Sequence, residues 1–117
     1  MTNDREGSAP LTPAQIFDKL PEFFRADQAQ GVTGVFQFDL AGAGGGRWQV
    51  AVEGGACQVT AEGERVPTVN FAMSAADFVG LVARTLDAQM AFMTGRIKVQ
   101  GDMFMALRFA QIFSFGA

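Results

Sequence analysis

The side chains that could do chemistry in this chain are a few carboxylates and one thiol, because the sequence contains no histidine. Without histidine, no Ser-His or Cys-His nucleophile and no imidazole metal ligand can form. Glu53, Glu62 and Glu64 lie at predicted turns, where an acid/base pair is conceivable but solvated carboxylates are far commoner. Cys57 lies in a strand pattern and is most simply a small, partly buried residue. We therefore expect no catalytic residue, no metal, no cofactor and no enzymatic activity of the chain on its own.

A glycine-rich segment and two basic residues are the remaining candidates for ligand binding. Residues 42–46 resemble a phosphate loop, but they lack the Gly-Lys-Ser/Thr ending and lead into a strand pattern, so we interpret them as a hairpin loop. Arg96 and Lys98 share one strand face and could attract a lipid headgroup or an anionic membrane, although ordinary solvated side chains are the commoner explanation. The net charge of −3 argues against nucleic acid as a partner.

Length and composition indicate one domain. The 117 residues include no long linker, and we expect a flexible N-terminal segment over 1–11 and a single domain over 12–117. A single cysteine cannot form an internal disulfide, which suits a reducing compartment. Neither a signal-peptide layout nor a run of about 20 apolar residues is present, so we expect a cytoplasmic protein.

An α+β fold must position these residues. The T-x-x-Q capping box at Thr12 predicts a helix from Pro13 to about Arg25. Alternating apolar residues predict four consecutive strands, which we expect to form an antiparallel meander, and then a fifth strand. These strands span 34–40, 48–53, 56–61, 66–73 and 96–100. Capping residues predict further helices after Ser74, Asp87 and Asp102. We expect a five-stranded, mostly antiparallel sheet that is covered on one face by helices.

The last helix, predicted from Met103 to about Phe115, has more apolar surface than a helix on a sheet requires. Its polar residues, Arg108 and Gln111, form a narrow strip, and apolar residues cover roughly 220° of the wheel. The chain has twelve phenylalanines and no tyrosine, so its aromatic side chains offer almost no hydrogen bonds. The second apolar flank could be sandwiched in the core, line a cavity or form a dimer interface. Nearby methionines favour an adaptable cavity.

The run QMAFMTGRIKVQGDM over residues 89–103 resembles the signature of the sterol carrier protein type 2 family. A helix end, a glycine, a basic and apolar strand, and Gly-Asp before the last helix follow one another there. The strand after Gly34, the strand with Trp48, and the S-x-x-D-F helix opening at Ser74 occur in the family's order, so the resemblance covers about residues 12–113. There are two departures: Thr68 stands where the family commonly has an acidic residue, and the Ser-Phe-Gly-Ala ending is not a peroxisomal targeting signal.

The resemblance implies an apolar tunnel between the sheet and the C-terminal helices that takes fatty-acyl or sterol-like ligands. Carried over position by position, the tunnel lining is Phe78, Leu81, Val82, Leu86, Met90, Phe92, Met93, Ile97, Met103, Leu107 and Phe113.

We accordingly predict a non-catalytic module that binds and carries an apolar lipid, namely a fatty acid, a fatty acyl-CoA or a sterol-like molecule. Transient membrane contact and a homodimer are compatible with this prediction. The alternative from another class is a dimerisation or accessory domain that supports a partner enzyme of lipid or quinone metabolism. The two hypotheses differ in whether a monomer holds an apolar ligand.

Overall fold

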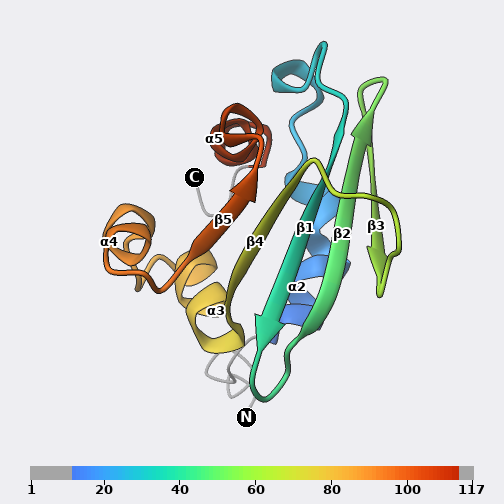
Figure 1. The fold of residues 1–117 in the computed structure, drawn as a ribbon. Helices are drawn as coiled ribbons and strands as arrows, with labels where there is room; N and C mark the ends of the chain where they lie inside the picture. The colour runs from blue at the N-terminus through green and yellow to red at the C-terminus, as the bar shows by residue number, and fades with distance from the viewer. Residues whose placement is uncertain (1–11, 114–117) are drawn as a thin grey trace, which may run out of the picture.

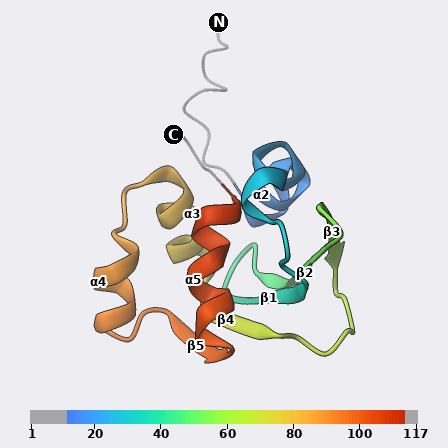
Figure 2. The same ribbon diagram turned by 90° about the horizontal axis from the view of Figure 1, so that it is seen from above.

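The computed structural model describes residues 12–113, which form a five-stranded sheet with helices on one face (Figure 1 and Figure 2). The strand order is β3-β2-β1-β4-β5. The strands are β1 Gly34–Ala41, β2 Gly46–Glu53, β3 Ala56–Ala61, β4 Val69–Ser74 and β5 Lys98–Gly101. The helices are α2 Pro13–Lys19, α3 Ala75–Ala83, α4 Ala88–Met93 and α5 Met103–Ile112, with short 3-10 turns η1 Leu20–Phe23 and η2 Ala26–Gln28. The predicted α+β class is confirmed.

The core lies between the inner face of the sheet and helices α2, α3 and α5. Phe38 of β1 is at its centre, with ring centroids 4.9 Å from Phe71, 5.1 Å from Phe109 and 5.6 Å from Phe78. Phe17 of α2 stacks on Phe78 at 5.0 Å. Aromatic pairs at these separations contribute packing energy in addition to the area that they bury. The phenylalanine-rich composition is therefore used largely to join the sheet to its helices.

The predicted antiparallel meander is wrong at its fourth strand. β1 pairs antiparallel with β2, and β2 with β3, but β4 pairs in parallel with β1 and antiparallel with β5. The chain therefore leaves β3 and crosses the outer face of the sheet, over residues 62–68, to the other side of β1. A central position allows β4 to bury Val69, Phe71 and Met73 on the inner face, which an edge next to β3 would not provide. The sheet nevertheless remains mostly antiparallel.

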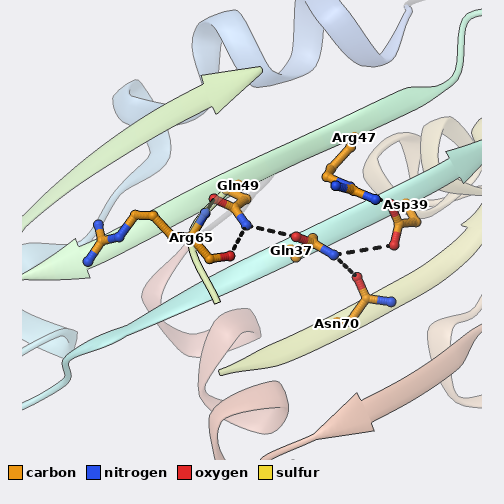
Figure 3. Close-up of polar contacts among 6 residues, drawn as sticks. All are labelled: Gln37, Asp39, Arg47, Gln49, Arg65 and Asn70. Atoms are coloured by element: carbon orange, nitrogen blue, oxygen red, sulfur yellow. Dashed lines mark hydrogen bonds and ion pairs between the residues drawn. The ribbon is translucent and has the colours of Figure 1, made fainter. Parts of the chain in front are cut away.

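A row of amide side chains holds this crossover to the outer face (Figure 3). Gln49, only 2% exposed, accepts a hydrogen bond from the Arg65 backbone N–H at 3.1 Å and donates to the Arg65 carbonyl at 2.6 Å. It also donates to Gln37 at 2.7 Å, and Gln37 donates to Asn70 of β4 at 3.0 Å. Buried amides normally require such partners. The row thus spans β2, β1 and β4 while it fixes the crossover.

The predicted helix caps are confirmed, with two changes in detail. The capping box of Thr12 and Gln15 is complete, but α2 ends at Lys19 instead of about Arg25 and continues as a 3-10 turn at Pro21, which lacks an N–H. Ser74 Oγ accepts the Asp77 N–H at 3.0 Å, while the Asp77 carboxylate binds Arg96. The predicted end of the last helix at about Phe115 lies outside the described residues.

Candidate functional site

Helices α4 and α5 expose apolar side chains that an ordinary globular surface would not display together. Seven large apolar side chains are exposed among residues 12–113, and six of them lie on these two helices. The six, called here the α4–α5 apolar set, are Met90, Phe92, Met93, Met103, Phe104 and Leu107. Exposed apolar residues that are concentrated in this way mark binding surfaces for ligands, partners or membranes.

Helix α4 is held mainly by its ends and by one buried residue, Ala91. Asp87 caps its first turn by accepting from the N–H groups of Gln89 and Met90. The Ala91 carbonyl accepts from Arg96 and Ile97 at 2.8 and 3.2 Å, which turns the chain back toward β5. Helix α4 lies at the periphery of the molecule, beyond α3 and β5 (Figure 1 and Figure 2). Its long side chains are consequently left exposed.

Helix α5 has a buried face and an exposed apolar face. Ile112 is fully buried, and the partly buried Phe109 packs on Phe36 of β1 with ring centroids 5.1 Å apart. On the exposed face, Phe104 and Leu107 are 82% and 69% exposed. The surplus apolar flank that the sequence predicts is therefore real, and in the described part of the chain no other element covers these side chains.

The eleven predicted lining residues fall into three groups. Phe78, Ile97 and Phe113 are buried in the core; Leu81, Val82 and Leu86 are partly buried against it; Met90, Phe92, Met93, Met103 and Leu107 are exposed. Phe113 already packs on Phe109 and Phe24, with ring centroids at 4.8 and 5.5 Å. The structure thus places the exposed group on α4 and α5. The ligand contacts of all eleven residues stay a prediction.

The expected tunnel between the sheet and the C-terminal helices is not shown. The two best-defined open hollows among the described residues include no predicted lining residue. One, of about 470 Å³, lies at the ends of β1 and β4 beside Arg96 and Lys98. The other, of about 360 Å³, lies between α2 and β3 beside Pro21 and Val59. Met90 and Met93 of the peripheral helix α4 are exposed in this structure.

Phe104 belongs to the exposed surface, but it was not among the predicted residues. It is 82% exposed, more than any residue of the predicted set. The helical wheel contained the signal, since Phe104 falls beside the polar strip of Arg108 and Gln111, where a phenylalanine has no structural reason to be. Met105, in contrast, is partly buried; a Cβ on Gly34 would lie only 2.5 Å from its methyl carbon.

The described residues do not assemble a recognisable reactive centre. Glu53 and Glu62 lie at opposite ends of β3, which separates them by roughly 20 Å at about 3.3 Å per residue. No group of three or more acidic or cysteine side chains among residues 12–113 could hold a metal ion. Burial raises the pKa of the Cys57 thiol, so this side chain favours its neutral form.

The two basic residues beside the larger hollow differ in their pairing. Arg96 binds Asp77 of α3 through Nη2 to Oδ1 at 2.6 Å and Nε to Oδ2 at 3.2 Å. It precedes β5, which begins at Lys98 instead of the predicted residue 96. Lys98 Nζ donates to the Gly95 carbonyl at 3.4 Å. Of these two residues, Lys98 therefore has no carboxylate partner among the described ion pairs.

No helix in the described range is long and apolar enough to span a membrane.

Comparisons with known proteins indicate the family of this chain. The hydroxysteroid dehydrogenase-like protein 2 of Xenopus tropicalis is 28% identical over 108 residues, which cover 92% of this chain and 25% of that protein. The chain thus spans about a quarter of the curated relatives it matches. The sterol carrier protein domain 2 of Helicoverpa armigera is 28% identical, with a TM-score of 0.67 and coverage of 89% of this chain and 91% of that one.

Two further solved structures share the fold. A palmitated sterol carrier-like protein of Aedes aegypti is 23% identical, with a TM-score of 0.65 and coverage of 87% and 94%. The sec-alkylsulfatase Pisa1 of Pseudomonas sp. is 21% identical, with a TM-score of 0.74, over 91% of this chain but 17% of that one. The model of the SCP-2 sterol transfer family matches residues 15–114. The chain therefore belongs to the SCP-2 sterol transfer family.

Proposed function

We propose that this chain binds the apolar part of a lipid-like molecule on helices α3, α4 and α5 and carries it without catalysing a reaction. The observation that carries the proposal is the α4–α5 apolar set, whose six side chains are exposed without a covering element in the described residues. Family membership supports a lipid as the occupant, since the matching family is one of sterol transfer. The palmitated state of the Aedes aegypti protein extends this support to a fatty acyl chain.

The energetics of such a site require burial of apolar surface and no specific polar contact. A sixteen-carbon chain gains on the order of 10 kcal/mol at about 0.8 kcal/mol per buried CH₂, before the costs of ordering are subtracted. Three methionines in the α4–α5 apolar set suit ligands of variable shape, because their side chains are flexible and polarisable. We therefore propose weak discrimination between different apolar tails.

In the proposed complex, one side of the ligand contacts partly buried residues of α3 and of the segment that follows it. Leu81, Val82 and Leu86 pack against the core and are neither fully buried nor fully exposed. In the proposed complex, the acyl chain covers these residues while α4 and α5 bury their exposed side chains against it. The ligand thereby provides packing contacts for the exposed side chains of α4.

The proposal includes no catalysed reaction because of the side chains that the chain offers. The chain has no histidine, and Glu53 and Glu62 lie at opposite ends of β3. Measurable turnover of an acyl-CoA or an ester by the purified chain would overturn this part of the proposal.

One observation favours a second function, that of an accessory domain for an enzyme of lipid or quinone metabolism. The chain matches only about a quarter of the hydroxysteroid dehydrogenase-like relative and 17% of the alkylsulfatase. In this alternative, the α4–α5 apolar set contacts another protein instead of a lipid.

Native mass spectrometry of the gently purified protein, combined with organic extraction, separates the two. A monomer with an apolar mass that extraction removes supports the carrier. An empty chain that also fails to take up added palmitate from solution contradicts the carrier and favours the accessory domain.

A further inference from the structure

The second surface of interest is the free edge of strand β3. It is the last strand on its side of the sheet, and no described helix or strand lies beyond it (Figure 1 and Figure 2). An edge strand presents unpaired N–H and C=O groups, and natural proteins usually protect such edges with lysine, proline, a bulge or a short strand.

The β3 edge has none of these protections. Its six residues, Ala-Cys-Gln-Val-Thr-Ala, include neither a charge nor a proline, and their register with β2 is unbroken from Ala56 to Ala61. The opposite edge, β5, has only four residues and carries Lys98. The two edges of one sheet thus differ, and only β5 resembles a protected edge.

The hydrogen-bond alternation identifies the groups that β3 directs outward. In an antiparallel pair, alternate residues exchange both backbone hydrogen bonds with the neighbouring strand. Gly54 and Gly55 form the two-residue turn, so Glu53 and Ala56 are a bonded pair, and the Glu62 N–H donates to the Arg47 carbonyl at 2.8 Å in the same alternation. The intervening residues of β3 direct their N–H and C=O groups away from β2; they are Cys57, Val59 and Ala61.

We propose that β3 pairs antiparallel with β3 of a second copy of this chain, which joins two sheets into one of ten strands. The register that pairs all three outward-directed residues, with the inner faces on the same side, sets Val59 opposite Val59 of the second copy and Cys57 opposite Ala61. On the outer face it sets the exposed Gln58 opposite Thr60. A second copy fits because the strand is uncharged, so two-fold pairing brings no like charges opposite each other within the strands.

The inner side of this edge also has apolar surface to cover. Val59 is partly exposed, and together with Ala61 it borders the 360 Å³ hollow beneath α2. In the proposed register, Val59 of the second copy lies beside this side chain. Two short strands bury less area than the roughly 1,000 Å² of a stable interface, so we expect a weak dimer that depends on concentration.

Charge variants at the two exposed outer-face positions test the pairing. Gln58→Lys/Thr60→Lys and Gln58→Glu/Thr60→Glu each set like charges opposite one another in the proposed dimer. Each variant should raise the dimer dissociation constant about tenfold or more in sedimentation velocity, since opposed like charges are destabilising. An equimolar mixture of the two variants should associate again as a heterodimer.

Two controls make the result decisive. Gln100→Lys adds a charge to the exposed face of β5 and should leave association unchanged. Thermal unfolding of each variant shows that it remains folded, and recovery of association in the mixture excludes misfolding as the cause. The proposal is overturned if the wild-type chain stays monomeric at all concentrations, if both double variants associate like the wild type, or if their mixture fails to associate.

Discussion

The guanidinium of Arg96 and the carboxylate of Asp77 form a two-point ion pair, with contacts of 2.6 and 3.2 Å. The pair joins the segment after α4 to the first turn of α3, between residues that are 19 positions apart in the sequence. Because α4 buries only Ala91, this ion pair is one of the few side-chain contacts that place its C-terminal end.

Arg96→Gln should therefore loosen α4 more than it destabilises the fold. The Arg96 side chain is 53% exposed, so we expect a loss of less than about 1 kcal/mol in the free energy of unfolding. Amide hydrogen exchange over residues 88–97 should accelerate. Arg47→Gln breaks a comparable exposed pair with Asp39 on the outer face and serves as the control. Equal acceleration of α4 in both variants would contradict this role of Arg96.

Leu107→Gln and Met90→Gln test the ligand surface. Both side chains are exposed, so neither change should lower the free energy of unfolding appreciably. Loss of apolar contact should weaken fatty-acid binding by about 1 to 2 kcal/mol, or roughly fivefold to thirtyfold in Kd, measured by displacement of a fluorescent fatty acid. Gln111→Glu, at an exposed polar position of the same helix, should leave binding unchanged. Parallel losses of binding and of stability would instead identify these side chains as ordinary core.

Gln49→Ala should destabilise the fold without affecting the ligand surface. It removes both hydrogen bonds to the Arg65 backbone and the donor to Gln37. Unpaired buried polar groups should cost about 2 to 3 kcal/mol, measured by urea denaturation. Gln100→Ala, an exposed amide on the same sheet face, should cost less than about 0.5 kcal/mol. An equally small loss for Gln49→Ala would show that the crossover does not depend on this side chain.

Gly101→Ala should be among the most damaging single-methyl additions. Gly101 has φ +111°, and a Cβ there would collide with the Thr68 carbonyl and approach the Val69 Cα to 3.0 Å. We expect a loss of about 2 to 4 kcal/mol in thermal or urea unfolding. At Gly31, with φ +77° and no atom within 4 Å of the added Cβ, the same change should cost only about 1 kcal/mol. Comparable losses of unfolding free energy at the two glycines would show that the clash with the Thr68 carbonyl does not contribute.

Local signals predicted the individual elements of this fold well, because the information is carried by neighbouring residues. The capping residues Thr12, Ser74, Asp87 and Asp102 all bind N–H groups of the helices that they precede. Strand alternation also identified the apolar, inward-facing residues of β1.

The pairing of β4 with β1 was not predictable from such signals. The crossover that leads to β4 is bound by Gln49 through the backbone of Arg65, sixteen residues away, and such a contact has no local sequence signature. The α4–α5 surface was predicted in part, since the apolar surplus of the last helix is visible on a wheel. Whether α4 packs inward is a tertiary property that no local pattern predicts, and its outward position leaves Met90 and Met93 exposed.

The most direct measurement of lipid binding is an NMR titration of the isotopically labelled chain with palmitate. We predict saturable binding of one acyl chain per protein, with the largest amide shifts in α4, α5 and the end of α3, and with slower hydrogen exchange in α4. Absence of saturable binding, or shifts confined to the outer face of the sheet around Gln37 and Gln49, would contradict the proposed lipid carrier.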